Sequence, residues 1–129
     1  MSRTQVMVKY VLVIDDEERI QEVVCACLED IGGWQTAIAD SGEAGWQAAT
    51  ASPPDAILLD VSMPDMDGIT LYEKLQNEPK TQGILVIFLT AKVLPADMAK
   101  FQALGVAGVI TKPFNPLTLV EELKQILGW

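Results

Sequence analysis

The sequence predicts an α/β protein built on one doubly wound sheet of five parallel strands, with a helix after each strand. Three observations carry this prediction. Short apolar segments of strand length alternate with segments of helical periodicity along the 129-residue chain. The apolar segments lack alternating polar residues, which is typical of strands covered by helices on both faces. Every connection is short, and alternation of this kind indicates right-handed parallel crossovers.

The segment from residue 10 to residue 33 has the clearest pattern. Residues 10–14 (YVLVI) form a continuous apolar run of strand length. The residues that follow repeat one apolar helix face over three turns, and Gly32 and Gly33 end this helix. The face consists of Ile20, Val23, Val24, Cys27, Leu28 and Ile31.

The second strand and helix are less strongly marked. Residues 34–39 (WQTAIA) predict a weaker strand. Either Asp40 or Ser41 then caps a helix that runs to about Ala51, because both side chains accept hydrogen bonds from free amides at a helix start. Residues 56–59 (AILL) are again short and apolar and predict the third strand.

The second half of the chain continues the alternation. Its most strongly apolar segment, ILVIFLT, predicts the fourth strand, and proline is favourable at the start of the helix that follows. The predicted elements are a helix from Ile69 to about Asn77, a strand at 84–90, a helix from Pro95 to Leu104 ended by Gly105, a strand at 108–111, and a helix opened by Pro116 with an apolar face of Leu119, Val120, Leu123, Ile126 and Leu127.

Composition and charge exclude some classes of function. Half of the residues are hydrophobic, which is enough to bury one sizeable core. The formal net charge of −9 argues against binding to nucleic acid, which depends on Lys and Arg, and against an anionic membrane surface. We therefore expect neither nucleic acid nor membrane among the partners.

The sequence also predicts a cytoplasmic protein. It has no run of about 18 apolar residues, and its first ten residues lack the apolar core of a signal peptide. Cys25 and Cys27 lie two positions apart, so on a helix they point in different directions. This spacing suits neither a redox pair nor a metal site, and we interpret both as small residues in a reducing compartment.

Polar residues follow four of the five predicted strands. In a doubly wound sheet, ligands bind outside the carboxyl ends of the strands, where these residues meet. A buried acid, a hydroxyl or a lysine at one strand end is unremarkable alone; their joint occurrence at four strand ends predicts a site. The residues are Asp15, Asp16 and Glu17 after the first strand, Asp60 after the third, Thr90 after the fourth and Lys112 after the fifth.

These residue types point to phosphoryl chemistry assisted by a metal ion. Crowded carboxylates repel one another, and a divalent cation relieves that repulsion. Mg²⁺ prefers oxygen ligands and takes one or two carboxylates, so Asp16, Asp60 and a backbone carbonyl leave room for water and phosphate. Lys112 can then pair with a phosphoryl oxygen and Thr90 can donate to another. A carboxylate can itself attack phosphorus and form an aspartyl phosphate.

Four motifs together resemble the receiver domain of two-component response regulators. Their order and spacing match that family over about residues 10–127, and the resemblance implies a flavodoxin-like sheet with strand order 2-1-3-4-5, which periodicity alone does not predict. The motifs are VLVIDDEE (11–18), ILLDVSMPDMDG (57–68), FLTA (88–91) and ITKPF (110–114).

The resemblance implies a role for each site residue. Asp60 is the expected phosphoacceptor. The expected Mg²⁺ site comprises Asp16 as a direct ligand, Asp15 acting through water, Asp60 itself and the backbone carbonyl of Ser62. Glu17 is expected outside this ligand set. Around the phosphoryl group the resemblance places Thr90, Lys112 and the backbone amide of Ala91, with a cis peptide bond between Lys112 and Pro113.

The resemblance also implies partners and organisation. Phosphate would come from a phosphohistidine on a sensor histidine kinase or a histidine phosphotransfer protein. The protein would not be a conventional enzyme, although Mg²⁺-dependent self-phosphorylation and autodephosphorylation are expected. Because Trp129 directly follows the last helix, we expect a single receiver domain spanning 1–129, with its core at about 10–127 and no output domain. It would then signal in a two-component or phosphorelay system by protein–protein contacts alone.

The expected contact face for the downstream target comprises the fourth helix, fifth strand and fifth helix. Most family members have an aromatic residue three positions before the lysine, where this sequence has Val109. A β-branched aliphatic side chain has no large rotamer swing, which argues against the usual aromatic switch. Val93 and Leu94, in the loop after the fourth strand, either contribute to this docking surface or are buried.

The same residues fit other functional classes less well. DMDGIT (65–70) resembles the motif of haloacid-dehalogenase-type phosphatases, but there the first aspartate follows a strand, whereas Met63 and Pro64 precede Asp65. Pro64 also excludes a calcium-binding EF-hand loop beginning at Asp60. We assign the acids of this motif to the turn before the third helix. A flavodoxin-like scaffold or binding module that acts independently of phosphorylation remains the alternative.

Overall fold

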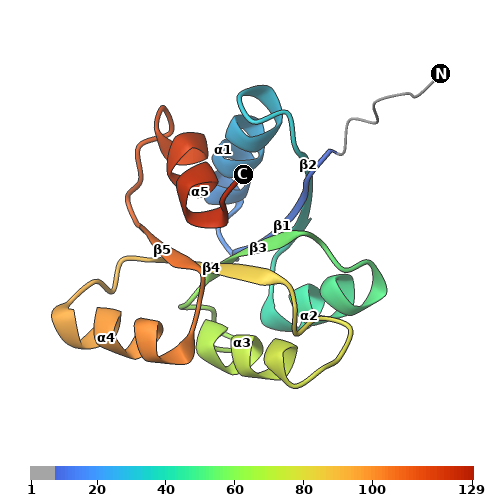
Figure 1. Ribbon diagram of the computed structural model, residues 1–129, viewed down its shortest axis with the longest axis vertical. Helices are drawn as coiled ribbons and strands as arrows, with labels where there is room; N and C mark the ends of the chain where they lie inside the picture. The colour runs from blue at the N-terminus through green and yellow to red at the C-terminus, as the bar shows by residue number, and fades with distance from the viewer. Residues whose placement is uncertain (1–7) are drawn as a thin grey trace.

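Five parallel strands form one sheet in the order β2-β1-β3-β4-β5, with a helix after each strand (Figure 1). This computed structural model describes residues 8–129. The predicted fold class and the strand order implied by the resemblance are both confirmed. The elements are β1 (Tyr10–Ile14), α1 (Glu18–Asp30), β2 (Gln35–Ala39), α2 (Gly42–Ala51), β3 (Ala56–Asp60), α3 (Gly68–Gln76), β4 (Leu85–Thr90), α4 (Pro95–Leu104), β5 (Gly108–Thr111) and α5 (Leu119–Leu127).

The sheet lies between two layers of helices, with α1 and α5 on one face and α2, α3 and α4 on the other (Figure 1). Because side chains alternate along a strand, each central strand contributes to both cores. The core beneath α1 and α5 takes Val11, Val13, Leu58, Ile87 and Leu89 from the strands. The core beneath the other three helices takes Leu12, Ile14, Ile57, Leu59 and Phe88.

Local signals in the sequence set several helix ends. Ser41, not Asp40, caps α2, because its Oγ accepts a hydrogen bond of 3.0 Å from the Ala44 amide. Pro95 is the first residue of α4. Gly105 ends that helix in the left-handed region at φ 85°, a conformation that glycine adopts without steric cost.

One predicted boundary and one predicted core residue are wrong. The last helix begins at Leu119 rather than at Pro116, because Asn115 holds the preceding residues in a turn. The Asn115 side chain accepts from the Leu117 amide at 2.9 Å, and its carbonyl accepts from the Thr118 amide at 3.1 Å. The first helix runs to Asp30 with Ile31 as its C-cap, directly before the predicted Gly32, but Ile31 is 57% exposed and does not belong to the apolar face predicted for it.

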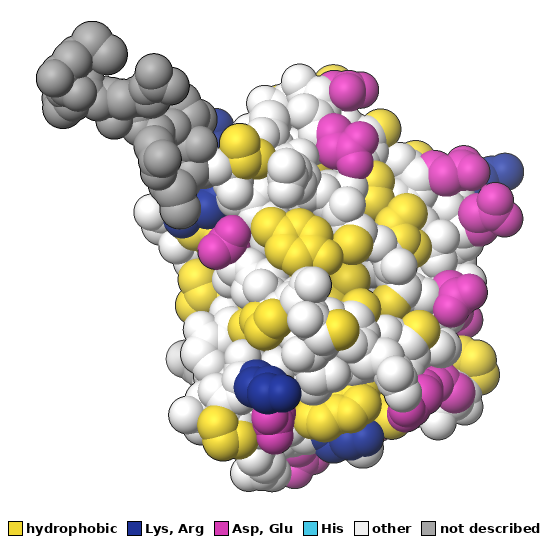
Figure 2. All heavy atoms as spheres, turned by 90° about the vertical axis from the view of Figure 1, so that its right-hand side faces the viewer, with side chains coloured by type: hydrophobic (Ala, Val, Ile, Leu, Met, Phe, Trp, Pro, Cys, Tyr) yellow, Lys and Arg dark blue, Asp and Glu magenta, His cyan; other side chains and the backbone are white. Residues whose placement is uncertain are grey.

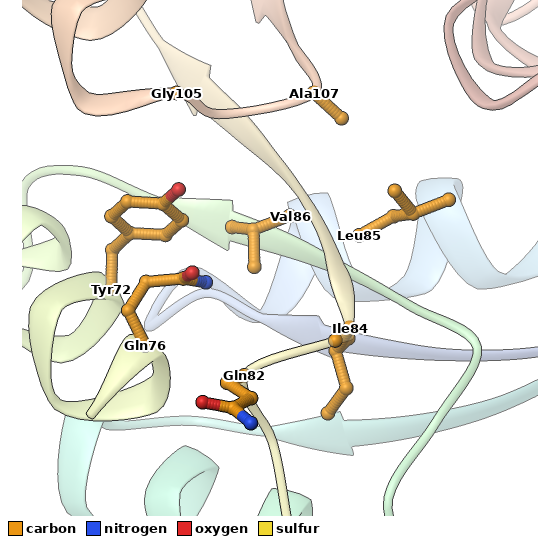
Figure 3. Close-up of a pocket in the computed structure, with 9 residues that line it drawn as sticks. Tyr72, Gln76, Gln82, Ile84, Leu85, Val86, Gly105 and Ala107 are labelled. Atoms are coloured by element: carbon orange, nitrogen blue, oxygen red, sulfur yellow. The ribbon is translucent and has the colours of Figure 1, made fainter. Parts of the chain in front are cut away.

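Two tryptophans pack together near the amino end of β2. The rings of Trp34, before β2, and Trp129, after α5, meet edge to face with their centroids 5.0 Å apart. The ammonium of Lys9 lies 5.0 Å from the centroid of a Trp129 ring. A hollow of about 190 Å³ lies at the same end of β4, and Tyr72 and Gln76 project toward it from α3 (Figure 3).

The outer surface reflects the acidic composition. On the side that carries β2 and α2, acidic, basic and hydrophobic side chains are interspersed, and hydrophobic side chains gather near its centre (Figure 2). The edge strand β2 contributes Ile38, which is 48% exposed. Between residues 8 and 129, no helix combines the length and the apolar character needed to cross a membrane.

Candidate functional site

The predicted polar residues meet at the carboxyl ends of β1, β3, β4 and β5. Asp15 directly follows β1, Asp60 and Thr90 are the last residues of β3 and β4, and Lys112 directly follows β5. Parallel strands end at one edge of the sheet, so their last residues are neighbours in space. Asp15 is fully buried and Asp60 and Thr90 are each 3% exposed. The structure therefore brings these residues together at one edge of the sheet, where the sequence placed them.

The backbone around Asp60 is held by the loop that follows it. Val61 donates a hydrogen bond of 3.3 Å to the carbonyl of Leu89 in β4, and the Gly68 amide donates one of 2.9 Å to the Val61 carbonyl. Gly68 packs directly on the end of β3: a Cβ at this position would lie 2.6 Å from the Asp60 carbonyl oxygen. The start of α3 and the end of β3 are therefore in close backbone contact.

Lys112 lies at the centre of the site. Its amide donates to the Thr90 carbonyl at 2.8 Å, and its peptide bond to Pro113 is cis, as the resemblance implied. Its Nζ lies 3.0 Å from Asp15 Oδ2, 3.3 Å from Glu17 Oε1 and 3.6 Å from Asp60 Oδ2. One ammonium group thus faces three carboxylates from two different strand ends.

The pKa values of Asp60 and Lys112 are both raised, the first mainly by burial and the second by neighbouring carboxylates. Burial raises the pKa of Asp60 to about 6; the charge of Asp15 and contact with Asp16 add to the effect, while the Ser62 amide and Lys112 oppose it. Burial alone would lower the pKa of Lys112, but the adjacent carboxylates outweigh it and raise the pKa. Negative charge therefore exceeds positive charge in this pocket.

The acidic residues offer a set of oxygen ligands that suits Mg²⁺. Asp15, Asp16, Glu17 and Asp60 each place a carboxylate oxygen within 4.8 Å of the others. Asp15 Oδ1 accepts from the Glu17 amide at 2.8 Å, whereas its buried Oδ2 has only the ion pair with Lys112 and no aligned hydrogen bond. Four carboxylates this close together, with the Lys112 ammonium beside them, suit a site that also holds a hard cation.

An open hollow of about 520 Å³ lies beside the acidic cluster. Asp16, Ser62 and Lys92 are among the residues that line it. The Ser62 amide donates to Asp60 Oδ1 at 3.0 Å, and the Lys92 amide donates to Thr90 Oγ1 at 2.9 Å. Because Thr90 Oγ1 accepts from Lys92, its own hydrogen is available for donation to a group bound in the pocket. Ala91 follows β4 directly and is exposed.

The acids of the DMDG segment lie outside this cluster, and each of them caps a helix. Asp67 Oδ1 accepts from the Ile69 amide at 2.8 Å at the start of α3, in agreement with its predicted place in the turn. Asp65 accepts instead from the amides of Gly42 and Glu43, at 3.0 and 3.1 Å, and so caps α2 from another loop. Sequence analysis missed this second role, since no local signal links residues 22 positions apart.

The protein is similar in sequence and structure to response regulators. The model of the response regulator receiver domain matches residues 11–124. The phosphate regulon transcriptional regulatory protein PhoB of Escherichia coli is 35% identical over 121 residues, which cover 94% of this chain and 52% of PhoB. The probable transcriptional regulatory protein TcrX of Mycobacterium tuberculosis is 36% identical over 91% of this chain and 49% of its own length.

Among solved structures, the chemotaxis protein CheY4 of Vibrio cholerae superposes with a TM-score of 0.86 at 28% identity, covering 93% of this chain and 99% of CheY4. The chain spans about half the length of the curated relatives named above. It belongs to the response regulator receiver family. Receiver domains of this family accept a phosphoryl group in two-component systems and typically bind Mg²⁺ at an acidic pocket.

Proposed function

We propose that Asp60 is the phosphoacceptor of this receiver. An oxygen of its carboxylate attacks the phosphorus of a phosphohistidine on a sensor histidine kinase or histidine phosphotransfer protein. The new oxygen–phosphorus bond forms as the phosphorus–nitrogen bond breaks, and the imidazole leaves with the electron pair of that bond. The observation that carries the proposal is the position of Asp60, 3% exposed at the end of β3 with Lys112 Nζ 3.6 Å from its Oδ2.

The acidic cluster provides the proposed metal ligands. Asp16, Asp60 and the backbone carbonyl of Ser62 would hold Mg²⁺, with Asp15 acting through water. The bound ion supplies positive charge, which lowers repulsion between these acids and the oxygens of an incoming phosphoryl group. The same ligand set explains why three acids are retained so close together despite their mutual repulsion.

The cationic and donor groups of the pocket orient the phosphoryl group. Lys112 would pair with one of its oxygens and Thr90 would donate its hydroxyl hydrogen to another, with the Ala91 amide beside them. Asp15 keeps the Lys112 ammonium in place through their 3.0 Å ion pair. These positions are fixed by strand ends, so the groups are ordered before a phosphoryl donor arrives.

We propose that the phosphorylated protein signals through the face formed by α4, β5 and α5. Leu94 and Val93, which the sequence left open between docking and burial, are 70% and 39% exposed. Met98 on α4 is also 39% exposed, and Phe101 is the buried residue of that helix. Val109 lies beside a hollow of about 390 Å³ between α4 and β5. An apolar face with a shallow hollow suits a protein partner.

Phosphate incorporation from acetyl phosphate tests the assignment. In the wild-type protein we expect Mg²⁺-dependent addition of one phosphoryl group, detected by intact mass, followed by slow self-catalysed hydrolysis. Asp60→Asn should abolish incorporation, while the control Asp65→Asn should retain it, because Asp65 caps α2 outside the pocket. A wild-type protein inert toward acetyl phosphate and toward a phosphorylated phosphotransfer domain would favour the phosphorylation-independent scaffold.

We also propose that the protein is cytoplasmic. Cys25 and Cys27 are both free thiols, which agrees with a reducing compartment.

A further inference from the structure

Glu17 is the outermost of the three carboxylates that face Lys112. Its side chain is 60% exposed, whereas the side chains of Asp15 and Asp60 are 0% and 4% exposed. The Lys112 ammonium donates a hydrogen bond of 3.3 Å to Glu17 Oε1 across 95 positions of the sequence. The solvent side of the ammonium is therefore occupied by an exposed carboxylate.

The backbone directs Glu17 toward this contact. Glu17 is the N-cap residue of α1, with extended dihedral angles of φ −93° and ψ 113°, and its amide donates to Asp15 Oδ1. Short side chains such as Asp or Ser cap a helix by accepting from its free amides, and Glu is not among the residues preferred for this role. The Glu17 side chain makes no such bond, and it reaches Lys112 instead.

A phosphoryl group on Asp60 would compete with Glu17 for Lys112. An ammonium has three N–H donors, and three carboxylates already face this one. Phosphorylation turns the Asp60 carboxylate into an acyl phosphate, so its phosphoryl oxygens would meet Lys112 beside Asp15 and Glu17. The Asp15 side chain is fully buried, whereas the 60% exposed side chain of Glu17 can turn into solvent and leave its N–H donor on Lys112 to a phosphoryl oxygen.

We propose that Glu17 is a specificity-determining residue of phosphoryl transfer, and this inference rests on the proposed function of Asp60. Its carboxylate occupies the outer side of Lys112 until the phosphoryl group replaces it. Because this carboxylate is negative and lies at the mouth of the pocket, it disfavours small donors that carry two negative charges. A donor with less charge, or one presented by a protein surface that compensates the charge, is affected less.

Rates with two small donors test this role. Acetyl phosphate carries two negative charges at neutral pH and phosphoramidate carries one. We expect Glu17→Gln, which keeps the size of the side chain, to speed phosphorylation by acetyl phosphate about three- to tenfold and by phosphoramidate less. The gain should shrink at high ionic strength. The matched control is Glu18→Gln, an exposed neighbour in the first turn of α1 that should leave the ratio of the two rates unchanged.

Two measurements without phosphoryl transfer complete the test. In metal-free protein, the ¹⁵N signal of Lys112 Nζ should shift in Glu17→Gln and stay in place in Glu18→Gln. Mg²⁺ affinity, measured by calorimetry, should change less than about threefold, as expected for one exposed charge. A loss of tenfold or more would make Glu17 a metal ligand and overturn the proposal.

The decisive quantity is the rate of phosphorylation by acetyl phosphate divided by the rate with phosphoramidate. If this ratio is the same in Glu17→Gln as in the wild type, the inference is overturned. The proposed function stays intact provided that Asp60→Asn still abolishes incorporation. Phosphate found on a residue other than Asp60 would instead overturn the proposed function and the inference with it. A larger ratio of these two rates in Glu17→Gln, together with a shifted ¹⁵N signal of Lys112 Nζ, supports the proposal.

Discussion

The two ends of the sheet differ in what their side chains contribute. At the carboxyl end, Asp15 and Asp60 are buried beside Lys112, with more negative than positive charge. At the amino end, Trp34 packs edge to face against Trp129. Buried charge costs free energy, whereas buried aromatic surface contributes it. The sheet thus has buried charge at the end where we propose phosphoryl chemistry, and aromatic packing at the other end.

The largest expected effect on stability is at the amino end. Trp34 is 8% exposed and belongs to the core beneath α1 and α5. Trp34→Ala should lower the free energy of unfolding by about 3–5 kcal/mol, through lost burial and the cavity that remains. Urea unfolding followed by circular dichroism measures this change. Phosphorylation of the fraction that stays folded should proceed at the wild-type rate, and a slower rate would contradict the separation of the two ends.

The next effect is at the carboxyl end, where Lys112 balances the acids. Lys112→Gln leaves the three carboxylates without a cation and should cost about 2 kcal/mol in metal-free buffer. Millimolar Mg²⁺ should stabilise this variant more than the wild type, because the metal then compensates a larger excess of negative charge. Thermal unfolding with and without Mg²⁺ compares the two proteins. Equal stabilisation by the ion would show that Lys112 and the metal site are independent.

Removal of the Asp60 carboxylate should increase stability instead of lowering it. Asp60→Asn takes away a buried carboxylate whose pKa is raised to about 6, mainly by burial, so its ionised form is disfavoured in the folded protein. The variant should unfold at higher temperature in metal-free buffer, with a gain of about 1 kcal/mol, a size common for changes at strained functional sites. Differential scanning calorimetry measures the gain. A less stable variant would mean that Asp60 supports the fold.

The smallest expected change in stability concerns Asp65, in the loop that follows β3 at the carboxyl end of the sheet. Hydrogen bonds from Gly42 and Glu43 lower the pKa of the exposed Asp65 carboxyl. The stabilisation is fully present above the ordinary aspartate pKa of 3.8 and is lost as the pH falls through the lowered pKa. Asp65→Asn should therefore be slightly less stable at neutral pH and converge with the wild type in acid. A difference that is constant across this pH range would exclude the carboxylate as its cause.

Much of the fold and most of the candidate site could be predicted from the sequence. The alternation of apolar runs with helical periodicity indicated every strand and helix, because burial on both sides of a sheet imposes that pattern. Asp60, Thr90 and Lys112 could be placed together since each follows a strand, and parallel strands end at one edge. Strand order depended on the family resemblance, because periodicity does not tell which strands are neighbours.

The features that sequence analysis missed depend on long-range contacts or on competing local bonds. Asp65 caps α2 and Glu17 pairs with Lys112 through side chains distant in sequence, and no spacing rule predicts such pairs. Pro116 suggested a helix start, but Asn115 forms a turn there that delays the helix to Leu119. Side-chain hydrogen bonds to the backbone offset the local preference of proline in this case.

The glycine at position 68 limits how this protein can be engineered. Gly68, the first residue of α3, packs so closely on the main chain of Asp60 and Val61 that there is no space for a Cβ. The Cβ of an alanine at position 68 would push against the main chain of Asp60 and Val61. It would shift the Asp60 carboxylate without changing the chemistry of any neighbouring side chain. Libraries that vary the 61–67 loop should therefore hold glycine constant at this position, because geometry at the strand end depends on it.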